Sequence, residues 1–134
     1  MARPFKLAIR TPEGEFFAGD VTSIRINTEG GQVKMLAKHA TIAATVVFSP
    51  VWVEADDSTE EFFVRRGVIF FDNIRNEATL LVNYCTRKAE MSRQTVEEYL
   101  KFIEERLTSG EKLSGFEIGF LEGEKLAVKM QLKG

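Results

Sequence analysis

The residues able to do chemistry are few in this chain of 134 residues, which has one histidine, His39, and one cysteine, Cys85. A catalytic triad needs a carboxylate that orients the histidine. Glu29 is the one acidic residue within ten positions of His39. A structural zinc site needs about four nitrogen or sulfur ligands, and one histidine with one cysteine fall short of that. We therefore expect no catalytic residue, no bound metal and no cofactor.

Two other motifs are weak signals. The Glu-Gly-Gly of residues 29–31 is not a phosphate-binding loop, because the sequence contains no G-x-x-x-x-G-K-[ST] pattern. The acidic residues at 56, 57, 60 and 61 match either a weak cation site or a solvated hairpin turn, and the turn is the simpler interpretation. Cys85 has no partner for an internal disulfide, and it fits a small buried strand residue in a reducing compartment.

Composition and charge narrow the class of protein. The chain has 18 basic and 20 acidic residues and a formal net charge of −2, so we expect no nucleic acid as a partner. The longest apolar run, Ile42–Phe48, is interrupted by Thr45 and is far below the roughly 20 residues of a membrane helix. Residues 1–9 lack the apolar core of a signal peptide. We expect a soluble chain that reaches a membrane only through partner proteins.

Residues 4–85 show the pattern of a β-sandwich. Apolar Phe5, Leu7 and Ile9 alternate with their neighbours, as in a half-buried strand. Strand breaks are predicted at Gly19-Asp20, at Pro50 and between residues 65 and 68. About ten short strands, with turns every eight to twelve residues, predict an all-β sandwich.

The period changes to that of a helix after residue 90. One helical face carries a stripe of four apolar residues, Val96, Leu100, Ile103 and Leu107. The helix begins either with a T-x-x-E capping box at Thr95 and Glu98 or one turn earlier with Ser92 as its cap. Gly110 is placed to end it.

The last segment, residues 113–134, alternates apolar and other residues at 116–120 and again at 126–132. Glycines at 115, 119 and 123 each cost a helix about 1 kcal/mol relative to alanine, so a β-hairpin fits this tail better than a helix. We expect a mainly β protein with a sandwich domain at residues 1–87 and a C-terminal helix and tail at residues 88–134.

The order of several motifs resembles one known family. Residues 11–15, Thr-Pro-Glu-Gly-Glu, and residues 17–21, Phe-Ala-Gly-Asp-Val, resemble the opening of the epsilon subunits of bacterial F-type ATP synthases. That family continues with a loop of glycine and glutamate and then L-P-G-H-A-P-L. Four residues follow this frame without a gap: Gly31, Leu36, His39 and Ala40.

A third match lies later in the chain. Residues 62–71 resemble the family strand F-A-V-S-G-G-F-L-E-V and retain Gly67, with Arg66 in place of one glycine, and residues 78–82 fit the strand V-T-V-L. The resemblance covers about residues 4–108. The second C-terminal helix of the family is alanine- and arginine-rich, and some members carry an ATP-binding D-x-x-R-A pattern there. The tail here has neither feature, so nucleotide binding is not expected.

The resemblance implies a function without catalysis. Such a subunit belongs to the central stalk of the rotor, binds the gamma subunit and the c-ring, couples proton-driven rotation to ATP synthesis, and regulates ATP hydrolysis in some members. The C-terminal segment is then the part that reaches the alpha and beta subunits. The implied location is peripheral, on the cytoplasmic face of the bacterial cell membrane, since no transit peptide points to the equivalent mitochondrial delta subunit.

The resemblance also implies which residues contact partners. The expected c-ring and gamma end of the sandwich consists of Glu29, Gly30, Gly31, Gln32, His39 and Ala40. The apolar stripe of the helix is the expected regulatory element. Two alternatives stay open at this point: a free-standing β-sandwich binding module unrelated to ATP synthase, and an enzyme with a concealed site around His39.

Overall fold

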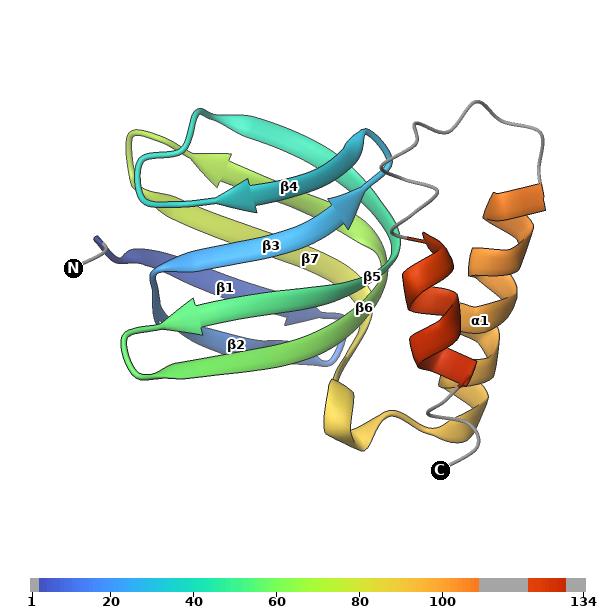
Figure 1. The fold of residues 1–134 in the computed structure, drawn as a ribbon. Coiled ribbons are helices and arrows are strands. Elements are labelled where there is room, and N and C mark those ends of the chain that lie inside the picture. Colours follow the sequence, from blue (N-terminus) through green and yellow to red (C-terminus); the bar gives the residue numbers. More distant parts are fainter. Residues whose placement is uncertain (1–2, 109–120, 130–134) are drawn as a thin grey trace. The chain divides into compact units, whose positions relative to one another are not determined.

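A computed structural model describes residues 3–108 and 121–129 of the chain. The polypeptide divides into two compact units, Met1–Glu90 and Met91–Gly134. The first unit contains the strands and the second contains the long helix (Figure 1).

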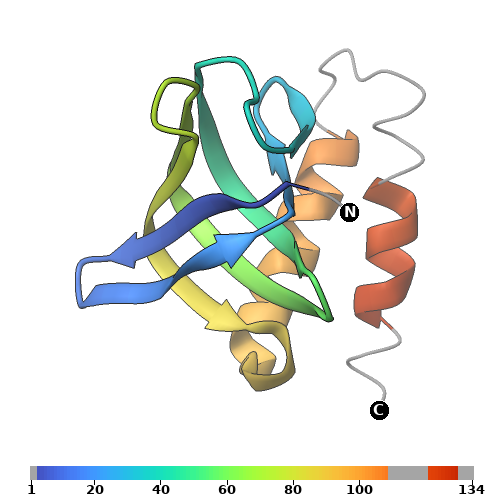
Figure 2. The same cartoon turned by 90° about the vertical axis from the view of Figure 1, so that its left-hand side faces the viewer.

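The first unit is one sheet of seven strands in the order β2-β1-β7-β6-β5-β3-β4. The strands are β1 (Phe5–Thr11), β2 (Gly14–Val21), β3 (Ser23–Thr28), β4 (Gly31–Met35), β5 (Ile42–Ala55), β6 (Ser58–Asp72) and β7 (Glu77–Arg87), followed by the 3-10 helix η1 (Lys88–Glu90). Neighbours are antiparallel except β1 and β7, which are parallel. The two longest strands, β5 and β6, curve so strongly that the sheet folds over on itself as a β-sandwich (Figures 1 and 2).

The core lies between the two layers and is rich in phenylalanine. The alternation predicted for β1 is confirmed, since Phe5, Leu7 and Ile9 are all buried. The rings of Phe5 and Phe71 meet edge to face with centroids 5.4 Å apart, a favoured geometry for aromatic pairs. Each such side chain contributes about 1.5–3 kcal/mol to stability by leaving water.

The sandwich is confirmed, but the prediction of about ten short strands is wrong, because the described residues form seven. Gly19 and Asp20 lie within β2, where they pair with Leu7 and Lys6. Pro50 lies within β5, just beyond the residues that pair with β3. A proline there withholds no hydrogen bond from that pairing.

The break predicted between residues 65 and 68 is wrong for a different reason. β6 continues through this segment, with Arg66 in the left-handed region at φ 54°. A Cβ atom on Gly67 would overlap the carbonyl oxygen of Leu81 and lie 2.7 Å from Val82 Cγ1. Glycine therefore permits a close approach of β6 and β7 rather than a turn.

The second unit contains α1 (Arg93–Thr108), as the helical period predicted. Of the two proposed starts, Ser92 is the cap, because its Oγ accepts a hydrogen bond from the Thr95 amide at 3.1 Å. A start at Thr95 is wrong by one turn. Val96 and Ile103 are buried, and Leu100 and Leu107 are half-buried. The proposed end at Gly110 lies outside the described residues.

Residues 121–129 form a second helix, so the hairpin predicted for the tail is wrong where it covers them. Burial recurs at positions 121, 124, 125 and 128, which is a helical spacing. Gly123 is the one glycine of the three that falls in this helix, and leucine, glutamate, lysine and alanine, which favour helices, make up most of the rest. Residues 116–120 lie outside the described part.

Contacts join the two helices of this unit. Lys125 Nζ lies 3.9 Å from Glu104 Oε1. Burial raises the pKa of the Tyr99 phenol, and the nearby Glu124 carboxylate raises it further. Neither α1 nor residues 121–129 provide a helix of the length and apolarity needed to cross a bilayer.

Gly67→Ala is expected to destabilise the sandwich by about 2–3 kcal/mol, the cost of forcing an atom into a filled space. The midpoint of urea unfolding should fall with the slope unchanged. Gly30→Ala is the matched control, since the nearest atom to its added Cβ is Thr28 Oγ1 at 3.8 Å; its midpoint should hardly move. Equal midpoints for the two variants would contradict the close-approach explanation.

Cys85 is expected to react slowly in the folded protein. Burial raises the pKa of its thiol from 9.0 to about 12, against an opposing effect of Arg87. At pH 8 the reactive thiolate is then on the order of one molecule in ten thousand, compared with about one in ten for an ordinary thiol. Alkylation by iodoacetamide, followed by mass spectrometry, should be slow in buffer and fast in urea. Similar rates in both would show that burial does not protect the thiol.

Candidate partner-binding site

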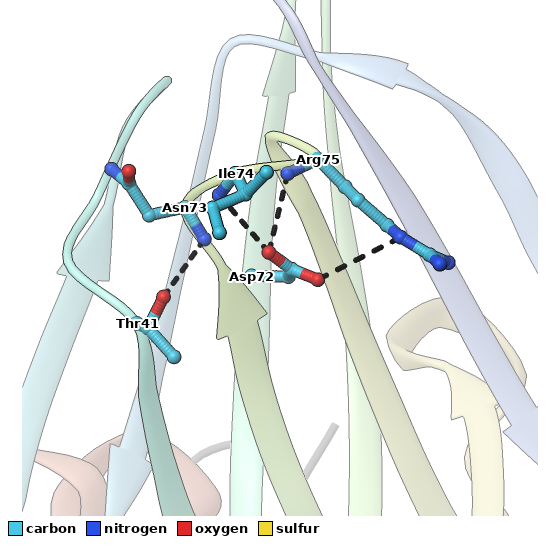
Figure 3. Close-up of polar contacts among 5 residues, drawn as sticks. All are labelled: Thr41, Asp72, Asn73, Ile74 and Arg75. Carbon is cyan, nitrogen blue, oxygen red and sulfur yellow. Dashed lines mark hydrogen bonds and ion pairs between the residues drawn. The ribbon is translucent and has the colours of Figure 1, made fainter.

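One end of the sandwich is organised by two asparagines. This end is formed by residues 36–41, which connect β4 to β5, and by residues 73–76, which connect β6 to β7. The Asn73 amide N–H donates to Thr41 Oγ1 at 3.0 Å (Figure 3). Its side-chain nitrogen donates to the carbonyl oxygens of Lys38 at 2.8 Å and His39 at 3.1 Å. Asn73 therefore fixes the segment that carries His39.

Asn76 makes the second set of connections. Its Oδ1 accepts from the Lys38 amide at 2.6 Å, and its Nδ2 donates to the Pro4 carbonyl at 3.1 Å. Its own carbonyl accepts from the Lys6 amide at 3.2 Å. Asn76 and Lys38 both have left-handed backbones, with φ 55° and 65°, a conformation that asparagine tolerates better than most residues. We name residues 36–41 and 73–76 together the asparagine end.

The turn between β6 and β7 is closed by Asp72. Asp72 Oδ1 accepts hydrogen bonds from the amides of Ile74 and Arg75 at 3.0 and 3.2 Å, and Arg75 Nε lies 3.9 Å from Asp72 Oδ2 (Figure 3). The turn holds Ile74 at its tip with 88% of its surface exposed. Leu36, in the neighbouring connection, is 51% exposed. Apolar side chains on so constrained a scaffold are suited to contact another protein.

His39 sits in this end as a half-buried residue. Its Nδ1 lies 2.8 Å from the Ala40 carbonyl oxygen, so Nδ1 carries the proton in this hydrogen bond. Its ring contacts the ring of Phe71 in a tilted arrangement, with centroids 5.6 Å apart and an angle of 59° between the ring planes. None of the described carboxylates forms an ion pair or hydrogen bond with it. This geometry suits a residue that shapes a surface rather than a general base.

The turn at residues 29–32 is a separate structure. Thr28 Oγ1 donates to the Gly31 carbonyl at 2.7 Å and accepts from the Gly30 amide at 3.2 Å. The Glu29 amide donates to the Thr45 carbonyl at 2.9 Å, and Gln32 Nε2 donates to Asn27 Oδ1 at 3.1 Å. The turn leads into β4, whose first two residues are Gly31 and Gln32, whereas the connection of residues 36–41 follows β4 (Figure 1). The six residues expected at one end of the sandwich thus lie in two groups at opposite ends of β4.

Sequence reasoning did not find Asn73, Ile74 or Asn76. Their segment, Asn-Ile-Arg-Asn, has the composition of a turn and matches no functional motif. An isoleucine at the centre of a polar turn was the available signal, because a large apolar residue gains nothing from water there. The described residues contain no group of three or more His, Cys, Asp or Glu side chains that would hold a metal ion.

Comparison with known proteins gives consistent matches. Residues 4–88 match the family model described as ATP synthase, Delta/Epsilon chain, beta-sandwich domain. The ATP synthase epsilon chain of Clostridium novyi (strain NT) is 32% identical over 109 residues, which is 81% of this chain and 82% of that protein.

Two solved structures share the fold. One is a chain of the Euglena gracilis mitochondrial ATP synthase (OSCP/F1/c-ring in rotational state 1), with a TM-score of 0.64 and 13% identity over 96% of this chain and 75% of that one. The other belongs to the central stalk/c-ring structure of the Tetrahymena thermophila mitochondrial ATP synthase, with a TM-score of 0.55 and 14% identity over 98% and 93%.

The family match covers more than half of the chain, and the Clostridium relative is similar along most of both sequences. The interpretation as a module unrelated to ATP synthase is therefore wrong. The chain belongs to the ATP synthase delta/epsilon family, as an epsilon-type subunit that has no catalytic role.

Proposed function

We propose that this epsilon-type subunit works in the central stalk of the rotor, where it binds the gamma subunit and the c-ring and couples proton-driven rotation to ATP synthesis. Family membership supports the proposal, as does the likeness to a chain of a central stalk/c-ring structure. One observation supports the proposal: the residues expected to contact partners lie in two groups, at the two ends of β4. A subunit that joins two partners needs two such regions.

The turn of residues 29–32 is the region proposed for the c-ring. Glu29, Gly30 and Gln32 are exposed, and the hydrogen bonds that Thr28 Oγ1 donates to Gly31 and accepts from Gly30 hold the turn in shape. Gly31 has φ 120°, which glycine adopts without steric cost. An exposed polar loop of fixed shape suits the polar rim of an interface.

The asparagine end, with His39 and Ala40, is the region proposed for gamma. The exposed side chains of Leu36 and Ile74 supply the apolar contact there. The hydrogen bonds of Asn73 and Asn76 hold both connections in place before binding. Such pre-organisation reduces the entropy lost on association.

The C-terminal segment is proposed to regulate ATP hydrolysis by reaching the alpha and beta subunits. Its element is α1, with the stripe Val96, Leu100, Ile103 and Leu107. Val96 and Ile103 are buried, so release of α1 would expose apolar surface that a new partner must cover. A switch of this kind requires two packings of similar free energy. The functional division is then residues 1–87 for docking and 88–134 for regulation.

The proposed location follows from the complex. The subunit is peripheral on the cytoplasmic face of a bacterial membrane, and it is held there by protein partners.

Ile74→Asp is expected to weaken binding to the gamma subunit of the same host by tenfold or more, because a charge replaces an exposed apolar anchor. The measurement is co-purification of the tagged full-length chain, followed by titration calorimetry. The urea midpoint should not change, since Ile74 is 88% exposed.

Leu126→Asp is the matched control, because Leu126 is also apolar and 63% exposed but lies in the second unit. It should leave gamma affinity unchanged, as should removal of residues 109–134. Wild-type affinity in Ile74→Asp would reject the asparagine end as the gamma site. Failure of the full-length chain to bind gamma at all would reject the stalk proposal.

Locking α1 to residues 121–129 is expected to alter the ATP hydrolysis rate of the assembled complex. Glu104 and Lys125 are close, with their charged atoms 3.9 Å apart, so Glu104→Cys with Lys125→Cys should accept a short bismaleimide crosslinker. Each single cysteine variant treated with the same reagent is the control. An identical hydrolysis rate before and after crosslinking of the double variant would count against regulation by movement of α1.

A further inference from the structure

A pocket on the outside of the sandwich has no role in the proposal above. We propose that it binds the carboxylate of an acidic segment from another protein. The pocket has a volume of about 290 Å³, and its lining includes Arg10, Thr11, Arg66, Leu81, Val82 and Asn83. These residues come from β1, β6 and β7. We name it the arginine pocket.

The two arginines of the pocket are available to an incoming anion. No described residue forms an ion pair or hydrogen bond with the side chain of Arg66. Arg10 has one carboxylate near it, Glu15 Oε1 at 3.9 Å, and the two side chains are 60% and 52% exposed. An exposed pair at that distance is weak. Two guanidinium groups, each a planar fork of donors, therefore face solvent at one site, and guanidinium forks match carboxylates.

The backbone conformation of Arg66 is unfavourable for an arginine, which suggests that its side chain has a function at this position. Its φ of 54° lies in the left-handed region, which few residues other than glycine adopt. Strand pairing is interrupted here, between the pairs Arg65–Tyr84 and Gly67–Val82. Glycine would take this conformation without steric cost. A strained position filled by a long cationic side chain on the rim of a pocket is a place to expect function.

The apolar and amide side chains of the pocket favour a protein segment over a free inorganic anion as its ligand. Leu81 is 42% exposed, and Val82 forms a buried apolar wall beside it. A glutamate side chain offers an aliphatic stem to Leu81 and a carboxylate to the arginines. Phosphate would leave Leu81 without a partner. Asn83, an exposed amide, adds a donor for the second carboxylate oxygen.

The test uses the isotope-labelled full-length chain and a defined probe. Acetyl-Leu-Glu-Glu-Leu-amide is titrated in, and the backbone amide signals of Gly67, Val82 and Asn83 are followed by NMR. We expect saturable shifts at these amides, and a loss of affinity on the order of tenfold in Arg66→Gly. Affinity should also fall in 0.5 M NaCl, because the charges are exposed and screened. The neutral probe acetyl-Leu-Gln-Gln-Leu-amide should cause no such shifts.

Arg66→Gly separates binding from folding, because it removes the cation and also the left-handed strain. Its urea midpoint should equal or exceed that of the wild type. Lys38→Gly is the matched control, since it removes one positive charge at another left-handed position, φ 65°, outside the pocket. Lys38→Gly should bind the acidic peptide as the wild type does.

Three results would overturn the proposal. They are the absence of pocket shifts with the acidic peptide, equal shifts with the neutral peptide, and equal losses in the two glycine variants. Inorganic phosphate is titrated at concentrations that match the negative charge of the acidic peptide. If phosphate shifts the same amide signals as strongly as the peptide, the pocket is a general anion site, and the proposal of a protein segment as its ligand is wrong. Each measurement uses the chain alone, so its failure is distinguishable from a failure of gamma binding at the asparagine end.

Discussion

At Gly67 the backbones of β6 and β7 come so close that a Cβ atom would overlap the carbonyl oxygen of Leu81. Gly67 pairs with Val46 of β5 and Val82 of β7, and the ribbons of β5 and β6 curve strongly along their length (Figures 1 and 2). Because β5 and β6 remain paired on both sides of the curve, a single sheet supplies both walls of the core. The buried phenylalanines, the turn at residues 29–32 and the asparagine end all take their positions from this curvature.

The asparagine end solves a second physical problem, which is how to hold irregular backbone at the end of a sandwich. Polar backbone groups need partners, and here two side-chain amides supply them to segments far apart in the sequence. Asn76 reaches Pro4, 72 positions away, and Lys38, 38 positions away. The result is a surface with exposed apolar side chains and a fixed backbone, which needs little reorganisation to bind.

The sequence predicted the elements whose apolar residues recur with a clear period. It did not predict features that depend on which strand lies beside a residue in the folded sheet. The alternation of Phe5, Leu7 and Ile9 and the helical stripe of α1 correspond to one buried face each, so the pattern alone identifies them. Pro50 and Gly67 are ordinarily breakers, but their effect depends on which strand lies beside them, and that information is not local. The hairpin prediction fails at residues 121–129 because apolar alternation and helical period overlap in a short segment, and the helix-favouring residues there outweigh the cost of one glycine.

The arrangement of the two proposed partner regions was only partly predictable for a similar reason. The resemblance implies contacts at residues 29–32 and 39–40, which are close in sequence. β4 separates the two groups, and five extended residues span about 17 Å. The sequence alone does not show whether the chain between these two motifs folds back, which would bring them together, or continues as an extended strand, which keeps them apart. The asparagines that position His39 come from residues 73–76, more than 30 positions away, so no local pattern could reveal them.

The separation of these two regions bears on how such a subunit would carry load. A force applied at the turn of residues 29–32 and resisted at the asparagine end would pass along β4 and its neighbour β3, then through β5 to the rest of the sheet. The path along each strand is covalent backbone, and each step from one strand to the next crosses a backbone hydrogen-bond ladder, in which many bonds must break together. A sandwich made from one continuous sheet therefore suits a mechanical role better than two sheets held together by side chains alone, and it needs no catalytic group to perform it.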